Sequence, residues 1–210
     1  MIATLRAPVI EAAEPHEGAR NELFRPRRCA AGCAHLESGE RMFESRVLGV
    51  DPGLARLGLA VVDGNGRKTD LVWAGAVDTA SGSEESERLR QLCVAVREAI
   101  SAYRPSSMAV ERVAWNKNHV SALSVARATG AIMVVAADAG LAVTEYGPNE
   151  VKMAVTGMGN ADKSQVRRAL VKVHSLRDVP VQADAADAVA VALTHLVGVR
   201  MRALARSGSR

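Results

Sequence analysis

Aromatic residues and cysteines are scarce in this chain of 210 residues. Tryptophan, tyrosine and phenylalanine together make up 3% of it, so aliphatic side chains and alanine must fill any core. The three cysteines are an odd count without the spacing of a disulfide framework, which indicates a reducing compartment. Cys29 and Cys33 with His35 suggest a metal clip, but a second ligand pair is missing, so we do not expect zinc there.

Long hydrophobic runs are also missing. No apolar stretch reaches the roughly 18 residues that a membrane span needs, and the N-terminus carries no cleavable apolar segment. We therefore expect a cytoplasmic protein with no membrane partner. With 48% hydrophobic residues, the chain can bury the core of one α/β domain plus appendages.

Positive charge is in modest excess, at +4 for the whole chain. Residues 1–45 contain six arginines and seven glutamates, so the excess lies in the rest of the chain, as a polyanionic partner would favour. Residues 1–45 show no sustained period of 2 or 3.6 residues, which predicts a disordered extension. Met42 is a candidate translation start, and the residues before it would then be a start-site artefact.

A short apolar run from Val47 to Val50 predicts a buried strand that ends at Asp51. Pro52-Gly53 predicts a tight turn, after which a second strand returns as far as Val62. A carboxylate at the end of a rigid strand suits metal coordination. An acid that merely caps the turn fits the same residues.

Helical and strand-like segments alternate through the rest of the chain. Cys93 falls in the apolar stripe of the first helix, where burial is a better interpretation than a nucleophile. We expect a hairpin turn at 63–66, strands at 68–77, 107–111 and 141–146, and helices at 84–103, 120–139, 162–174 and from 182 onward, with a short helix opening at 147–150.

The strand 107–111 repeats the first design, because an apolar run again ends in a carboxylate, Glu111. Glu111 and Asp51 would lie side by side if their strands are neighbours. The next segment places Trp115 beside Lys117 and Asn118, a mixture typical of loops that stack on single nucleic-acid strands. A loop anchored by a buried Trp115 is an equal alternative.

Residues spaced for tight packing recur along the helix expected at 120–139. The small ones among them permit close approach of another helix, either within the chain or across a dimer seam. The residues are Ala122, Leu123, Ala126, Gly130, Val134 and Ala137.

Gly157 and Gly159 precede the helix expected at 162–174, an arrangement that can bind a phosphate through free backbone N–H groups. The glycine spacing excludes a Walker loop. On that helix Lys163 and Arg167 are four residues apart, as are two further cations. Such rows are often a solvated face, but beside a phosphate-like helix start we favour nucleic-acid contact.

Asp184 and Asp187 are three residues apart and share one face at the start of the last helix. Acids in a first turn usually complement the helix dipole. Flanked by alanines, this pair could also reach a common ion. Arginines without acids close the chain, so residues 200–210 are expected to form a basic tail suited to phosphate contact.

These segments together resemble the RuvC family, the bacterial Holliday-junction resolvases or crossover junction endodeoxyribonucleases. The resemblance runs from about Arg46 to His195. It rests on the motifs around Asp51, around Glu111, around Lys152, at 155–163 and at 184–188. It implies an RNase H-like α/β fold over residues 46–199, with a mixed five-stranded sheet, helices on both faces, and a homodimer.

The resemblance further implies metal-dependent cleavage of four-way DNA junctions during recombination and repair, with the RuvA–RuvB branch-migration complex as a partner. Two Mg²⁺ ions per subunit, with Mn²⁺ as a substitute, would be bound by the catalytic residues. These are Asp51, Glu111, Asp184 and Asp187, and the expected DNA contacts are Trp115, Lys117, Asn118, Lys152, Lys163 and Arg167.

One position departs from the family pattern. Three residues after the catalytic glutamate the family tends to carry an aromatic, usually phenylalanine, which wedges into the junction centre. Here Ala114 stands at that position and Trp115 follows it. We hypothesise that Trp115 takes over the stacking role.

Two other functional classes stay open. The Asp-Pro-Gly turn also resembles the first phosphate motif of actin-like ATPases and sugar kinases, but those proteins need two such lobes and a longer chain. A non-cleaving module that binds junctions is the other alternative, and the four intact carboxylates argue against it.

Overall fold

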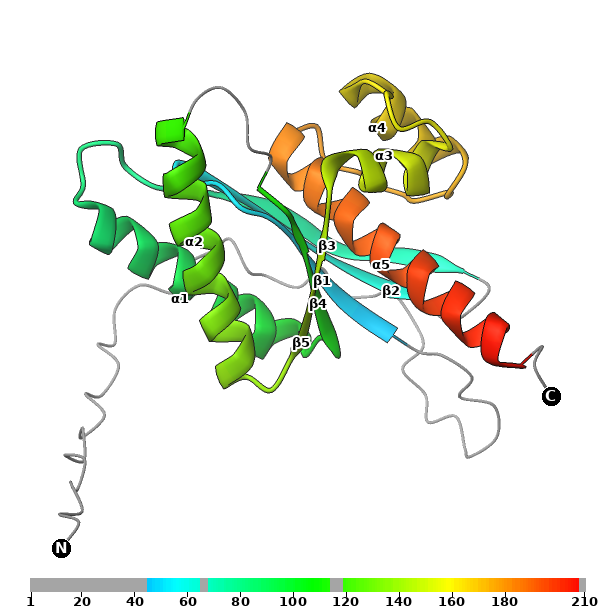
Figure 1. The fold of residues 1–210 in the computed structure, drawn as a ribbon, viewed down its shortest axis with the longest axis horizontal. Coiled ribbons are helices and arrows are strands. Elements are labelled where there is room, and N and C mark those ends of the chain that lie inside the picture. The colour runs from blue at the N-terminus through cyan, green and yellow to red at the C-terminus, as the bar shows by residue number, and fades with distance from the viewer. Residues whose placement is uncertain (1–44, 65–67, 114–118, 208–210) are drawn as a thin grey trace, which may run out of the picture.

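The computed structural model describes residues 45–64, 68–113 and 119–207 (Figure 1). Trp115, Lys117, Asn118 and the cysteine pair of the considered zinc clip lie outside these residues. In chain order the elements are β1 (Ser45–Asp51), β2 (Arg56–Gly64), β3 (Thr69–Asp78), α1 (Glu85–Tyr103), β4 (Ser107–Glu111), α2 (His119–Asp138), β5 (Ala142–Tyr146), α3 (Pro148–Thr156), α4 (Lys163–Lys172) and α5 (Ala183–Ser207).

The strands form one five-stranded sheet in the order β3-β2-β1-β4-β5. Neighbours β1 and β2, and β2 and β3, run antiparallel, whereas β1, β4 and β5 are parallel. The predicted mixed sheet is therefore confirmed. Val50 stands opposite Val110 in the β1–β4 pairing, so the next residues, Asp51 and Glu111, leave the same edge of the sheet together.

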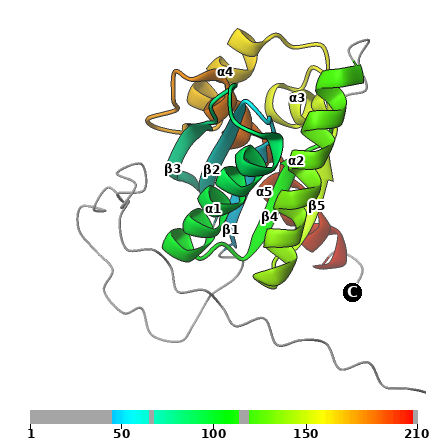
Figure 2. The ribbon, with the colours of Figure 1, turned by 90° about the vertical axis from the view of Figure 1, so that its left-hand side faces the viewer.

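Helices cover both faces of the sheet, as expected. Helices α1 and α2 lie on one face, and α3, α4 and α5 lie on the other (Figures 1 and 2). Because both faces are covered, the central strands are apolar on both sides. Leu48 and Val50 pack into the core under α1 and α2, whereas Val47 packs into the core under α5.

Helix α5 lies directly on the sheet because glycine faces alanine along their contact. A Cβ at Gly49 would overlap the carbonyl oxygen of Ala188, and one at Gly58 would overlap that of Asp184. The alanines of α5 at this contact, including Ala188 and Ala192, are fully buried. Backbone therefore meets backbone, and the start of α5 is brought to the edge where Asp51 emerges.

A buried polar contact fixes the middle of α5 against the parallel strands. The two ring nitrogens of His195 lie 3.2 Å from the hydroxyl of Ser107 on β4 and 3.0 Å from the hydroxyl of Tyr146 on β5. His195 is only 6% exposed, so both of its nitrogens need partners. These contacts join α5 to the two strands that lie beyond β1.

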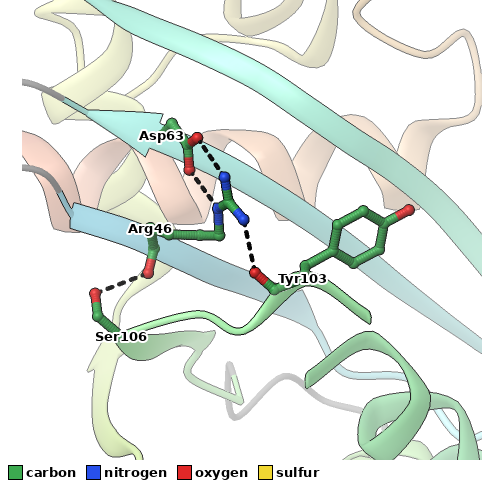
Figure 3. Close-up of polar contacts among 4 residues, drawn as sticks. All are labelled: Arg46, Asp63, Tyr103 and Ser106. Atoms are coloured by element: carbon green, nitrogen blue, oxygen red, sulfur yellow. Dashed lines mark hydrogen bonds and ion pairs between the residues drawn. The ribbon is translucent and has the colours of Figure 1, made fainter. Parts of the chain in front are cut away.

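The opposite end of the sheet carries an arginine clamp (Figure 3). Arg46 donates to both carboxylate oxygens of Asp63, its cross-strand neighbour, at 2.7 and 2.8 Å. Its remaining amino group donates to the carbonyl of Tyr103 at 2.8 Å, at the end of α1. The hydroxyl of Ser106 donates back to the carbonyl of Arg46 at 3.0 Å. The clamp thus fastens β1, β2 and α1 together.

The predicted elements agree with the observed ones to within a few residues, and α5 continues through most of the expected basic tail. Cys93 is half-buried against the core under α1, and burial raises the pKa of its thiol, which supports a packing role. None of the described helices is long and apolar enough to span a membrane.

Candidate active site

Two strand ends deliver the first pair of acids. Side chains alternate between the two faces of a strand. Asp51 therefore lies on the same face of β1 as Val47, and Glu111 on the same face of β4 as Ala109. Val47 and Ala109 both pack toward α5. Asp51 and Glu111 are half-buried, and their carboxyl groups are close enough that each acts on the pKa of the other. The expected side-by-side placement of these residues is confirmed.

The pair holds a proton at neutral pH in the absence of a cation. Burial, then the negative charge of Glu111 and of Asp187, raises the pKa of Asp51 from its usual 3.8 to about 8. Burial also raises the pKa of Glu111, against the opposing effect of its hydrogen bond with Asp51. Two carboxyl groups this close cannot both ionise unless positive charge is supplied.

Helix α5 supplies the second pair of acids, Asp184 and Asp187. Both are half-buried, and both are close enough to Asp51 for their charges to raise its pKa. The free N–H groups at the start of α5 favour carboxylates there. Four acids that lie up to 136 positions apart in the chain therefore share one electrostatic neighbourhood.

Two lysines border the acids. Lys163, the first residue of α4, donates to a carboxylate oxygen of Asp187 at 2.7 Å. Lys152, on α3, and Lys163 both lower the pKa of Glu111 by their charge. The structure thus brings together both lysines that the sequence singled out, whereas Arg167 lies one turn further along α4.

Arg56 is a neighbour of the acids that the sequence did not indicate. It lies at the start of β2, and its Nη1 is 3.7 Å from a carboxylate oxygen of Asp184. Its Nε donates to Asp78, its cross-strand partner at the end of β3, at 2.6 Å. A single arginine after a turn carries no motif, so only the sheet register could have revealed it.

The phosphate site expected around Gly157 and Gly159 is wrong. Gly157 ends α3 in the left-handed conformation, with φ of 75°, and that is what requires glycine there. Asp162 caps α4, and its carboxylate accepts the N–H of Gln165 while the Gln165 side chain accepts the N–H of Asp162. A helix start already filled by a carboxylate does not attract a phosphate.

The donor set fits hard divalent cations. It consists of four carboxylates without sulfur, and Mg²⁺ prefers such oxygen ligands. The raised pKa of Asp51 indicates that a positive charge nearby would stabilise its ionised form. Within the described residues, the acids do not close into a tight cage around a single point. Each acid of α5 instead lies in ion-pair range of a basic residue, Arg56 for Asp184 and Lys163 for Asp187.

The sequence matches a known protein family over most of the chain. The family model "Crossover junction endodeoxyribonuclease RuvC" matches residues 47–195. The RuvC of Parafrankia sp. is 48% identical over 152 residues, which cover 72% of this chain and 85% of that protein. The RuvC of Brevibacillus brevis is 41% identical over 150 residues, 71% of this chain and 90% of that protein.

A solved structure extends the match to the fold. Thermus thermophilus RuvC in complex with a Holliday junction substrate aligns with a TM-score of 0.70 and 36% identity, covering 75% of this chain and 96% of that chain. The expected RNase H-like fold is thereby confirmed. With the family model matching most of the chain, this protein belongs to the RuvC family of crossover junction endodeoxyribonucleases.

Proposed function

We propose that this protein is a crossover junction endodeoxyribonuclease that resolves four-way DNA junctions by paired, metal-dependent phosphodiester hydrolysis. The observation that carries the proposal is the convergence of Asp51 and Glu111 from neighbouring strands with Asp184 and Asp187 from α5. Membership of the RuvC family and the junction-bound relative from Thermus thermophilus support the choice of substrate.

The four carboxylates are the proposed ligands of two Mg²⁺ ions, for which Mn²⁺ can substitute. The charges of Glu111, Asp184 and Asp187 all act on Asp51, so Asp51 is the acid best suited to be a shared ligand. Cations bound there supply an activated water and neutralise the charge that develops on the leaving oxygen. Because burial raises the pKa of both Asp51 and Glu111, cation binding there would be favoured at higher pH.

Lys152 and Lys163 are the proposed contacts to the scissile phosphate. Both are close enough to Glu111 to act on its pKa, so a phosphate bound beside the acids would meet two ammonium groups. Lys163 donates to a carboxylate oxygen of Asp187. A bound cation would neutralise Asp187 and free this lysine to bind the DNA backbone.

Further cations on α4 extend the proposed DNA surface. Arg167 lies one turn from Lys163 on the same side of the helix, and the exposed Arg168 and Lys172 form a second cationic row. Trp115, Lys117 and Asn118 belong to the segment just after Glu111, and their contact with the junction, including the stacking role of Trp115, stays a prediction. Unchanged junction binding by a Trp115→Ala variant would contradict that role.

A symmetric junction needs two cuts, so we propose a homodimer with two equivalent sites. Helix α2 offers an apolar stripe on its outer face: Leu123 is 51% exposed and Val134 60% exposed, and Gly130 and Ala137 between and beyond them are exposed as well. Of the residues expected at the seam, Ala122 instead packs inward. The RuvA–RuvB partner and the cytoplasmic location stay predictions.

A synthetic four-way junction with a labelled strand tests the function. Incubated with protein and Mg²⁺, it should yield two symmetric nicks, which EDTA should abolish, and a linear duplex of the same sequence should stay intact. Equal cleavage of the duplex, or nicking in EDTA, would contradict the proposal. ATP hydrolysis without DNA would instead indicate an actin-like ATPase.

A further inference from the structure

Both the side chain of Arg56 and the backbone just before it are fixed by hydrogen bonds. Its cross-strand partner Asp78 accepts from its Nε at 2.6 Å. The backbone just before it is fixed by Thr79, which donates its hydroxyl to the carbonyl of Leu54 at 2.6 Å and its N–H to the carbonyl of Ala55 at 3.0 Å. The guanidinium therefore has a defined position although its side chain is 48% exposed.

That fixed guanidinium points one arm toward a catalytic acid. Nη1 of Arg56 lies 3.7 Å from Oδ2 of Asp184, too far for a direct hydrogen bond but within ion-pair range. Arginine can bridge two carboxylates because its donors form a rigid planar fork, which the single ammonium of lysine cannot reproduce. Asp78, Arg56 and Asp184 thus form a chain from β3 through β2 to α5.

We propose that Arg56, anchored by Asp78, is a positioning residue that orients the carboxylate of Asp184 toward the acids at the strand ends. This inference rests on the proposed function. Groups that orient the ligands of a metal site typically change activity 10- to 100-fold when they are removed. Asp187 has its own basic partner in Lys163, so each acid of α5 is held by one cation from another element.

Direct binding of DNA by Arg56 is the competing role, and the charges disfavour it. Arg56 lies between Asp78 and Asp184, so the three side chains together carry a net charge of −1 and would repel a phosphate. Lys163, by contrast, forms one ion pair among the described residues, with Asp187, and Asp51 and Asp184 act on it only at longer range. We therefore assign the phosphate to the lysines and the orientation of Asp184 to Arg56.

Three variants separate these roles: Arg56→Gln, Arg56→Lys and Asp78→Ala. Single-turnover cleavage of the four-way junction should fall about 10-fold in all three, because each breaks the fork or its anchor. The Arg56→Gln/Asp78→Ala double variant should lose no more than Arg56→Gln alone, since the two residues act as one unit. Junction affinity in EDTA, and its dependence on salt, should stay at the wild-type values in every case.

The opposite pattern would overturn the proposal. If Arg56 binds phosphate, Arg56→Gln would weaken junction binding and lower its salt dependence, Arg56→Lys would retain activity, and Asp78→Ala would tighten binding. Wild-type cleavage in all three variants would also overturn it. If the wild-type protein fails to cut junctions at all, the proposed function fails instead, so the two failures are distinguishable.

Two controls complete the experiment. Arg46→Gln removes an arginine–aspartate pair at the far end of the sheet, and it should leave cleavage by the folded protein unchanged. The NMR signal of the Arg56 Nε–H provides a readout that does not depend on activity. It should be shifted and slow to exchange in the wild-type protein, lost in Asp78→Ala, and retained in Asp184→Asn, because Asp78 rather than Asp184 accepts that hydrogen bond.

Discussion

Two arginine–aspartate pairs bridge neighbouring strands at opposite ends of this sheet. In the clamp, Arg46 donates hydrogen bonds to both carboxylate oxygens of Asp63, and its Nη1 donates to the carbonyl of Tyr103. At the active-site end, Arg56 donates its Nε to Asp78, and its Nη1 faces the carboxylate of Asp184. Both arginines pair with a cross-strand aspartate, and the group that each guanidinium meets beyond that aspartate distinguishes the pair that fastens the fold from the pair that faces the site.

The two ends also differ in charge balance. The clamp pairs one cation with one anion and backbone carbonyls, so its charges are neutralised. The other end concentrates four acids, and burial, followed by the repulsion of the neighbouring acids, raises the pKa of Asp51 to about 8. Such a cluster opposes folding in the absence of cations, a cost that functional sites commonly impose. The following experiments test that contrast.

The largest effect is expected from Asp51→Asn. It removes the acid on which the charges of the other three acids act, so single-turnover cleavage of a junction should fall by at least about 10³-fold. Junction affinity, measured by fluorescence anisotropy in EDTA, should be unchanged, because it depends on lysine and arginine. A variant that loses affinity together with cleavage would indicate misfolding instead.

Gly58→Ala should come next. Its new Cβ would overlap the carbonyl oxygen of Asp184 and push the start of α5 away from Asp51. We expect a loss of cleavage of about 10- to 100-fold and a drop in unfolding free energy of about 1–3 kcal/mol. Kinetics and chemical denaturation measure these two effects. Gly82→Ala, at an open position, is the matched control, and wild-type cleavage by Gly58→Ala would contradict the close contact.

The acid cluster should make stability depend on pH and on Mg²⁺. The pKa of Asp51 is raised from 3.8 to about 8 in the folded protein, so between these values the folded state binds a proton that the unfolded state has released. The free energy of unfolding therefore falls as pH rises from about 4 to about 8. Without metal, Tm should drop by several degrees between pH 6 and 9.

Mg²⁺ should reverse that drop, because it binds the folded state selectively. The Asp51→Asn variant is the control: its Tm without metal should change less with pH and should exceed that of the wild-type protein at pH 9. Thermal unfolding curves with EDTA or Mg²⁺ provide the measurement. Identical pH profiles for the two proteins would rule out Asp51 as the titrating group.

The smallest effect on catalysis is expected at the clamp. Arg46→Gln breaks two hydrogen bonds to a carboxylate and one to a carbonyl, and it should lower the unfolding free energy by about 2 kcal/mol. Cleavage per folded molecule should stay the same. Denaturant unfolding measures the loss of stability, and kinetics normalised to the burst amplitude measure cleavage per folded molecule. If cleavage fell more than the loss of folded protein explains, the clamp would also serve the active site, which would contradict the contrast between the two ends of the sheet.

Local sequence was enough to predict the strands and the acids. Val47 to Val50 and the run before Glu111 are apolar and end in a carboxylate, so strand type and the site residue come from the same few positions. That these strands are neighbours could not be derived from periodicity, because pairing is a long-range property. The resemblance to a known family implied only that the acids share a metal site, and the strand register shows that the two strands are neighbours.

Contacts that depend on register or on competing caps were not predictable. Arg56 contacts Asp78 because the register of β2 and β3 places the two residues opposite each other. The residues next to Arg56 in the sequence do not predict this register. Gly157 and Gly159 looked like a phosphate loop because a helix start follows them. Asp162 fills that start with its own carboxylate, and the glycine conformation at Gly157 serves the end of α3 instead.

The glycine–alanine contact beneath α5 has a consequence for how this enzyme can vary. Where two backbones touch, no side chain is available to rearrange, so a larger residue must move the helix as a rigid rod. Ala192 lies eight residues, or about 12 Å along the axis, from Asp184. A larger residue at Ala192 or Gly49 would shift Asp184 and Asp187 at the start of α5. An inherited substitution at either position would therefore lower cleavage as if a catalytic residue had been changed.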